Sequence, residues 1–263
     1  MRRASTCVAV IGLAMLALAS AASAAPTITL RAKAVPIPGF PGTGNFYGAG
    51  AAVEYELTIK GTEYGGYQPP LIGVKVFLPE GVKLHPAGFP TCPQQTIEAK
   101  EPEKCPKQSS AGPRGYASGF VVFGTERVPE TVSVEGFYAP GGGLNFVVLG
   151  HTPASIEIVS VGRYAQLNGG GGYGPEGIVE VPLIQTVPGA ADASAEKITG
   201  KLGSAIKRKG KKPLYYGTLP LKCPKHHLTA KVELTFAENG DISTPVSVPL
   251  TYNLPCPKKA KKK

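Results

Sequence analysis

The sequence has no tryptophan, only four histidines and only two aspartates, Asp192 and Asp241, among its 263 residues. A calcium site normally draws on clustered Asp and Asn side chains, which are missing here. The cysteines include no Cys-x2-Cys pair, the spacing common in structural zinc sites. Gly210-Lys211-Lys212 lacks the earlier glycine and the following Ser or Thr of a phosphate-binding loop. The sequence therefore predicts neither a metal site nor a cofactor.

A catalytic constellation is also missing from the sequence. Ser109 or Ser110, His151 and Asp192 supply the residue types of a hydrolase triad. No Gly-x-Ser-x-Gly signal accompanies them, so nothing indicates that they meet in space. We predict no catalytic residue, and an extracellular hydrolase with an unrecognised site is kept as an alternative.

The first 24 residues are expected to be removed from the mature protein. Arg2 and Arg3 precede an apolar run from Cys7 to Ala19, and Ala22-Ser23-Ala24 is a small-x-small cleavage site. This arrangement is typical of a secretory signal peptide, with an uncleaved membrane anchor as the alternative. Beyond it, no run approaches the roughly 20 apolar residues of a membrane span.

Glycine and proline are abundant, at 34 and 26 residues, and divide the chain into short segments. Within these segments, apolar and polar residues alternate with a period of two, as in half-buried strands. In the segment 52–60, for example, Val53, Tyr55, Leu57 and Ile59 share the inward face, and Glu54, Glu56 and Lys60 the outward one. Strands are predicted over residues 27–35, 52–60, 72–78, 120–123, 128–138, 144–149, 156–164, 177–187, 198–206, 214–221, 228–236 and 242–252.

These segments predict an all-β protein, specifically an antiparallel β-sandwich of immunoglobulin-like or jelly-roll-like type. A single all-β domain reaches roughly 200–250 residues, so the length allows one large sandwich or two packed ones. We expect the sandwich region to cover residues 25–257, with any subdivision near 188–197. It would follow an N-terminal signal helix and precede a basic disordered tail over residues 258–263.

Once Cys7 leaves with the signal peptide, four cysteines remain, each followed by proline: Cys92, Cys105, Cys223 and Cys256. An even number in an exported chain favours two disulfides, although four cysteines permit three pairings. We expect Cys92 to pair with Cys105, closing a short loop worth about 3 kcal/mol on the chain-entropy model. Residues 95–100 inside this loop are predicted to form one helical turn.

The other predicted pair, Cys223 with Cys256, follows from the last hairpin, whose turn contains Asn239-Gly240. A two-residue loop would set Phe236 opposite Ser243, which mixes apolar and polar residues on one face of the hairpin. A three-residue loop with a bulge shifts the pairing by one residue and sets Leu234 opposite Val246, so that one face of the hairpin is buried throughout. We expect this second register, with Ile242 on the buried face. Either register brings the two cysteines within one residue of each other across the hairpin.

Two prolines mark the last predicted strand as an edge of the sheet. Pro245 and Pro249 stand at alternate positions, so their missing N–H groups point to the same side. That side cannot form a full ladder of hydrogen bonds with another strand. The segment 242–252 is therefore predicted to be an edge strand guarded against further pairing.

The excess positive charge is local. The formal net charge is +10, and it falls to +8 without Arg2 and Arg3. Two clusters account for more than this excess: Lys207, Arg208, Lys209, Lys211 and Lys212, and then Lys258, Lys259, Lys261, Lys262 and Lys263. A solvated hairpin tip and a disordered tail would explain them. The functional alternative is an electrostatic surface for an anionic cell-envelope polymer or membrane surface. No motif predicts specific nucleic-acid recognition.

Loop aromatics offer one further candidate site. Tyr64 and Tyr67 lie in a predicted loop and would supply stacking surfaces for a glycan, against the alternative of half-buried tyrosines at strand ends. His226 and His227 follow Cys223 closely and are interpreted as a surface pair, because a disulfide removes that cysteine as a ligand. A glycan-binding module is accordingly a second functional hypothesis.

Several motifs resemble a group of uncharacterised exported bacterial proteins. They are Leu78-Pro79-Glu80-Gly81-Val82, Phe89-Pro90-Thr91-Cys92-Pro93, Cys105-Pro106-Lys107-Gln108-Ser109, the segment 231–237 and Pro255-Cys256-Pro257. The resemblance covers most of the mature chain and implies a secreted β-sandwich whose cysteines are structural. It implies no activity.

Together these observations predict a secreted or cell-envelope-associated protein without catalysis, acting through binding or as a structural surface component.

Overall fold

The computed structural model describes residues 25–259, apart from positions 101, 167, 187, 224, 225 and 239. The predicted signal peptide, at residues 1–24, and residues 260–263 of the predicted basic tail lie outside the described residues. The strands are β1 (Thr27–Val35), β2 (Ala52–Lys60), β3 (Leu71–Pro79), β4 (Lys83–Leu84), β5 (Gly115–Phe123), β6 (Glu126–Ala139), β7 (Gly143–Gly150), β8 (Ile156–Gln166), β9 (Tyr173–Glu180), β10 (Ser194–Leu202), β11 (Ala205–Arg208), β12 (Lys211–Tyr215), β13 (Gly217–Thr218), β14 (His227–Glu238) and β15 (Asp241–Pro255). The helices are α1 (Gln94–Lys100) and two 3-10 turns, η1 (Pro102–Lys104) and η2 (Lys107–Ser109).

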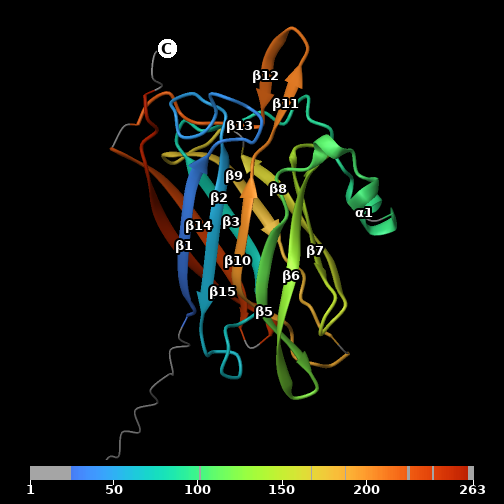
Figure 1. The fold of residues 1–263 in the computed structure, drawn as a ribbon. Coiled ribbons are helices and arrows are strands. Elements are labelled where there is room, and N and C mark those ends of the chain that lie inside the picture. The colour runs from blue at the N-terminus through green and yellow to red at the C-terminus, as the bar shows by residue number, and fades with distance from the viewer. Residues whose placement is uncertain are drawn as a thin grey trace, which may run out of the picture.

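Eleven strands form one antiparallel sheet in the order β1-β2-β10-β5-β6-β7-β8-β9-β3-β14-β15. The sheet curls round so that its two end strands, β1 and β15, come back into contact (Figure 1). The predicted all-β, antiparallel fold is confirmed. The predicted sandwich is not confirmed, because a single sheet buries its inward faces by curling on itself. The pairs β11-β12 and β13-β4 form two small additional sheets.

The two end strands meet through one tyrosine instead of a ladder of backbone bonds. The Tyr252 hydroxyl on β15 donates to the Ala32 carbonyl and accepts from the Ala32 N–H on β1, both at 3.2 Å. Pro245 and Pro249 are on β15, which pairs only with β14. The predicted edge strand is therefore confirmed. The Tyr252 side chain, and not the backbone of β15, makes the hydrogen bonds to β1.

The strand β10 shows a long-range connection that the sequence pattern did not reveal. It pairs with β2 on one side and β5 on the other. The predicted strand 198–206 is divided in the structure: residues 198–202 belong to β10 and residues 205–206 to β11, with a break at Gly203, where φ is +122°. An added Cβ at Gly203 would lie 2.7 Å from the Ala52 Cα, so this bend needs glycine. The subdivision near 188–197 stays a prediction.

The last hairpin corrects the expected register. Glu238 pairs with Asp241 across the tight turn, but Ala237 already pairs with Pro245. Three residues of β15, 242–244, bulge out between these pairs, so Leu234 faces Val248 and not Val246. The shift from the expected pairing is two residues, so the buried face is preserved as predicted. Ile242 lies in the bulge and is 63 % exposed, contrary to expectation.

Charged residues on the outward face of the first strands are paired with each other. Lys33 Nζ lies 2.9 Å from a Glu54 carboxylate oxygen, and Lys197 Nζ lies 2.7 Å from one of Glu56. The hydrogen bond and charge of Lys197, with the charge of Arg31, outweigh desolvation and lower the pKa of Glu56. These cross-strand pairs join β1, β2 and β10 on the solvent side, each with a modest contribution.

Both disulfides pair as predicted, Cys92 with Cys105 and Cys223 with Cys256. The first anchors α1 against the outer face of the sheet, where buried Ile97 packs with Phe137 and Val147. The predicted helical turn over residues 95–100 is confirmed as α1. The second closes although Cys223 precedes β14, so the hairpin ladder is not what aligns the two cysteines.

We predict that the second disulfide stabilises the protein more than the first. The enclosed segments differ, with sequence separations of 13 and 33 residues, and the chain-entropy model gives about 3 and about 4 kcal/mol respectively. Replacing each pair by two serines and measuring guanidinium unfolding tests this order. A smaller loss for the Cys223–Cys256 variant than for the Cys92–Cys105 variant would contradict it.

Candidate functional site

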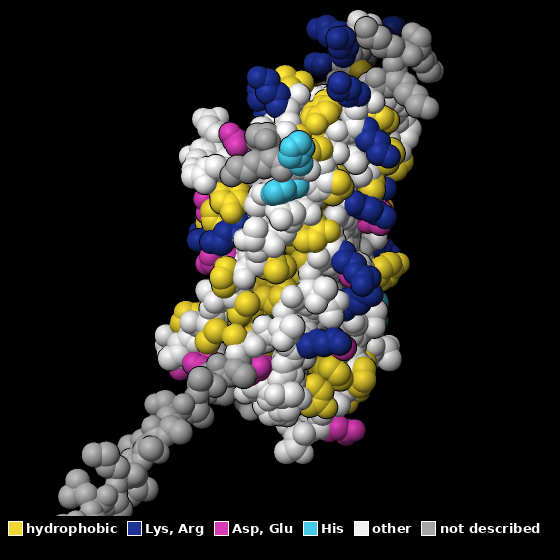
Figure 2. Space-filling model, turned by 90° about the vertical axis from the view of Figure 1, so that its left-hand side faces the viewer, with side chains coloured by type: hydrophobic (Ala, Val, Ile, Leu, Met, Phe, Trp, Pro, Cys, Tyr) yellow, Lys and Arg dark blue, Asp and Glu magenta, His cyan; other side chains and the backbone are white. Residues whose placement is uncertain are grey.

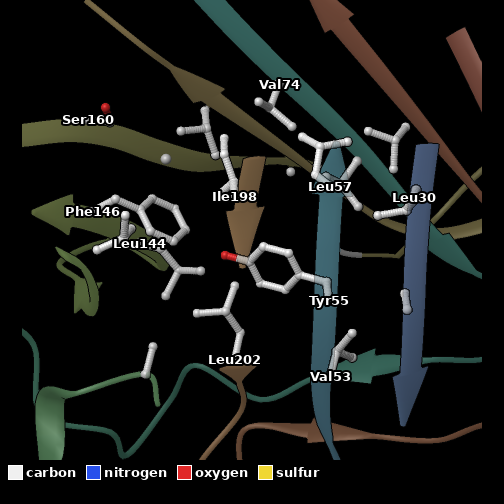
Figure 3. A pocket seen from close by; sticks show the side chains of 18 of the residues that line it. Leu30, Val53, Tyr55, Leu57, Val74, Leu144, Phe146, Ser160, Ile198 and Leu202 are labelled. Carbon is white, nitrogen blue, oxygen red and sulfur yellow. The ribbon is translucent and has the colours of Figure 1, made fainter. Parts of the chain in front are cut away.

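A cavity of about 540 Å³ lies inside the curled sheet. Its wall is formed by the inward side chains of strands around the whole sheet (Figure 3). Val53 and Leu57 point inward from β2, Val74 from β3, and Ile198 and Leu202 from β10. Interiors of folded proteins are close-packed, with few voids larger than a water molecule. A hollow of this size is therefore a feature of the fold that requires explanation.

Packed clusters bound the cavity toward both ends of the sheet. Near one end, a cluster packs together Ile59, Leu71, Leu234 and Phe236. A second cluster beside it contains Val121, Ala154 and Ile156. At the other end Phe89, Ala111, Tyr138 and Tyr216 pack together below the β11–β12 hairpin. The side chains that fill an ordinary core are thus gathered near the ends, and the middle is left open.

The Tyr55 hydroxyl is the polar group that reaches furthest into the cavity among those drawn in Figure 3. Its ring lies over Gly200, the cross-strand partner of Tyr55 on β10. A Cβ at Gly200 would lie 2.6 Å from the hydroxyl oxygen, so this glycine makes room for the ring. Hydrogen bonds join the hydroxyls of Tyr138, Tyr164 and Tyr216 to other described residues, whereas none does so for Tyr55. Burial raises the pKa of Tyr55 to about 12.

Three more tyrosines form a hydrogen-bonded cluster at the end below the β11–β12 hairpin. The rings of Tyr138 and Tyr216 stack with centroids 3.9 Å apart, and Phe89 packs edge-on against both. The Tyr216 and Tyr164 hydroxyls lie 2.7 Å apart, and the Tyr138 hydroxyl lies 2.8 Å from Ser204 Oγ. Burial raises the pKa of all three, to about 12 for Tyr164. These phenols are satisfied within the protein, unlike that of Tyr55.

Two buried carboxyl groups lie near the opposite end of the cavity. Glu130 accepts hydrogen bonds from the N–H groups of Thr131 at 3.0 Å and Ala154 at 2.9 Å, which explains its burial. Asp192 has one carboxylate oxygen without a hydrogen-bond partner in the described structure, and burial raises its pKa. Neither group is joined by a hydrogen bond to a described histidine, so neither forms an acid–base pair of the kind a hydrolase uses.

The residue types considered for a hydrolase are not brought together. The Ser109 hydroxyl donates to the Pro106 carbonyl at 2.6 Å, and Ser110 interacts with Gly112. His151 is exposed after β7 and shares no hydrogen bond with these serines or Asp192 within the part of the chain that the structure describes. No group of three or more metal-ligating side chains occurs among the described residues.

The two tyrosines considered for a glycan are half-buried and already stacked. The Arg127 guanidinium lies 4.8 Å from the Tyr64 ring centre and 4.6 Å from that of Tyr67. Phe120 packs against Tyr67 with centroids 4.5 Å apart, and the Tyr64 hydroxyl accepts the N–H of Asp192. A sugar would have to compete for these ring faces.

The ten basic residues proposed as an electrostatic surface divide between structured and undescribed positions. Lys207, Arg208, Lys209, Lys211 and Lys212 occupy the exposed tip of the β11–β12 hairpin. Lys258 and Lys259 are exposed at the same end of the sheet, while Lys261, Lys262 and Lys263 lie outside the described residues. In the described part of the chain, no helix is long and apolar enough to span a bilayer.

The sequence reading missed the cavity, although one signal was present. Several inward positions carry residues too small to fill an interior: Ala32, Ala117, Gly162, Gly177 and Gly200. Within a predicted sandwich, such positions are absorbed by the facing sheet. In a single curled sheet no facing sheet exists, so the same residues leave empty space.

We predict that the four tyrosines whose pKa is raised titrate late and couple stability to alkaline pH. A phenol whose pKa is higher in the folded state than in the unfolded state stabilises the folded state while it is protonated. This stabilisation is complete below the unfolded-state pKa of about 10 and is lost as pH rises through the folded-state pKa. Stability should therefore fall from about pH 10 upward. Absorbance of tyrosinate should show Tyr55, Tyr138, Tyr164 and Tyr216 lagging in folded but not urea-denatured protein. Titration of all eleven tyrosines together in folded protein would contradict this.

Comparisons with known proteins identify no relative of this chain. Family models, curated proteins and solved structures were compared with this chain, and none matches. The function of the site therefore rests on the residues that line the cavity.

Proposed function

We propose that this protein is an exported, non-catalytic binding protein that holds an apolar or amphipathic small molecule inside its curled sheet. The single observation that carries the proposal is the largely apolar cavity of about 540 Å³ inside the curled sheet. Ligand pockets for small molecules fall in the range of roughly 300–1,000 Å³. The volume therefore suits one organic molecule of moderate size.

The chemistry of the wall selects an apolar ligand. The side chains labelled in Figure 3 are apolar, apart from the hydroxyl groups of Tyr55 and Ser160. Removing apolar surface from water lowers the free energy, so water is a poor occupant of such a space. A hydrocarbon or aromatic ligand would recover the dispersion contacts that the lining residues lack.

The Tyr55 hydroxyl adds a specificity element. A hydroxyl in apolar surroundings is costly to leave without a partner. A ligand with a single hydroxyl, carbonyl or carboxyl group would satisfy it while its apolar body fills the rest of the cavity. The favoured ligand class is accordingly an amphipathic molecule with one hydrogen-bonding group.

Export is supported by the predicted signal peptide together with the two disulfides. Disulfides persist in oxidising compartments and are rare in the cytosol of mesophiles. Secretion or attachment to the cell envelope is accordingly part of the proposal. The resemblance to exported bacterial proteins with Cys-Pro motifs stays a prediction of the sequence.

The two alternatives have less support in the structure. Glycan binding through Tyr64 and Tyr67 would have to displace Arg127 from their rings. A hydrolase needs a nucleophile or acid with an adjacent base, and the candidate serines donate to or accept from backbone groups instead. Binding in the cavity requires neither rearrangement.

We predict that filling the cavity abolishes ligand binding. Ala117 on β5 points inward opposite Ile198 and Val132, so Ala117→Phe places a ring in the hollow. Thr131 on β6 is exposed, and Thr131→Phe adds the same ring outside as a matched control. Fluorescence titration with N-phenyl-1-naphthylamine should show saturable binding to the wild type and the control, and at least about tenfold weaker binding to Ala117→Phe. Equal binding to all three proteins, or none to the wild type, would contradict the proposal.

We predict that Tyr55→Phe weakens binding only of ligands with a hydrogen-bonding group. One neutral hydrogen bond contributes about 1 kcal/mol, which corresponds to about fivefold in affinity. Decan-1-ol and decane, each competing against the fluorescent dye, separate the two contributions. The alcohol should bind about fivefold less well to Tyr55→Phe, whereas decane should bind both proteins alike. An equal loss for both compounds would indicate damage to the cavity in place of a lost hydrogen bond.

A further inference from the structure

Charge is unevenly distributed along the molecule. The chain from 203 to 223, which includes the β11–β12 hairpin, carries six Lys or Arg and no Asp or Glu. The turns at the opposite end of the sheet carry acidic residues, among them Glu63, Glu126, Asp192, Glu238 and Asp241. Figure 2 shows basic side chains at the top of this face of the molecule and others down its side. An anionic partner would therefore orient the protein with this end forward.

The cations of this end are free to meet a partner. Lys33, Arg114, Arg163 and Lys197, on the sides of the sheet, are engaged in salt bridges with glutamates. No such pair involves the hairpin residues 207–212 within the described part of the chain. The hairpin also projects beyond the end of the sheet (Figure 1). Its charges are thus neither neutralised nor screened by neighbouring strands.

A second basic segment is fixed at the same end. The Lys258 N–H donates to the Asn45 carbonyl at 2.8 Å, and the Lys258 carbonyl accepts from the Tyr47 N–H at 3.2 Å. The Cys223–Cys256 disulfide ties this segment to the chain that carries Lys222. Two stretches far apart in sequence therefore present their lysines on one end of the protein.

Apolar side chains lie among these cations. Leu221 is 78 % exposed, next to Lys222, and it lies close to Gly48 in the 36–50 loop. Phe40 in the same loop lies under the Lys207 ammonium, 5.8 Å from ring centre to nitrogen. Basic residues mixed with exposed apolar ones suit a lipid bilayer, because the lysines meet the headgroups and the apolar groups meet the acyl boundary. A soluble polyanion would use only the charges.

We propose that this end of the protein, comprising the β11–β12 hairpin, Leu221, Lys222, Lys258 and Lys259, docks on an anionic phospholipid membrane. The docking does not depend on the cavity being occupied. If the cavity holds an amphipathic molecule, docking would place the protein at the surface from which such a molecule is drawn.

Vesicle sedimentation of the full mature protein tests the proposal. We expect binding to phosphatidylcholine vesicles that contain phosphatidylglycerol, weak binding to phosphatidylcholine alone, and loss at high ionic strength. Neutralising Lys209, Lys211 and Lys212 to glutamine should lower the partition coefficient about a hundredfold at low ionic strength. A matched variant with Lys60, Lys75 and Lys197 changed to glutamine, all away from this end, has the same net charge and should bind nearly as well as the wild type.

The role of Leu221 separates a membrane from a soluble polyanion. Leu221→Ser should weaken binding to the anionic vesicles severalfold while leaving binding to polyphosphate unchanged. Equal losses for the two triple-lysine variants would overturn the proposal, because binding would then follow net charge alone. Binding to polyphosphate without binding to anionic vesicles would overturn it as well. Dye binding in solution is measured separately, so failure of vesicle docking is distinguishable from failure of the cavity.

Discussion

The fold depends on the closure of one long sheet. A closed sheet widens as strands are added, and about eight strands already give an interior just wide enough for side chains to fill. Eleven strands close here, with Tyr252 bridging the end strands at Ala32. In the middle of the sheet the interior is then too wide for its side chains to fill, although side chains of β2, β3 and β14 pack together near one end. The cavity is therefore a geometric result of strand number, reinforced by small inward residues such as Gly200 and Ala117.

Alternation in the sequence predicted most strands and their inward faces, because a period of two is a local property of each strand. In β2 and β14 the predicted inward residues are the ones that face the interior. Alternation does not say what covers the inward face, so a facing sheet and a curled sheet look alike in sequence. It was equally silent about β10, whose neighbours β2 and β5 are far from it in the chain. The bulge at 242–244 escaped notice because it preserves the pattern on both sides.

The site was less predictable than the fold for the same reason. Tyr55 was placed on the inward face of its strand by alternation, yet a buried tyrosine ordinarily finds a partner for its hydroxyl, as Tyr164 and Tyr216 do here. Whether Tyr55 does so depends on the distance to the opposite wall, which only closure determines. By contrast, the disulfide pairing was predictable because Cys92 and Cys105 are close in sequence. The pairing of Cys223 with Cys256 was right although the expected register was not.

Because the interior is hollow, the stability of the protein depends on its shell, meaning the sheet itself and the groups packed at its ends and on its outer face. The packed clusters bound the cavity toward its ends, and the hydrogen-bonded ladders and outward ion pairs lie in the wall around it. Both disulfides also lie outside it, one fixing α1 to the outer face and the other tying the last strand to the basic end. Cross-links in these places rigidify the wall without occupying the space within. Because the disulfides stabilise the shell, the fold tolerates an unfilled interior that would weaken an ordinary core, where each lost contact costs free energy.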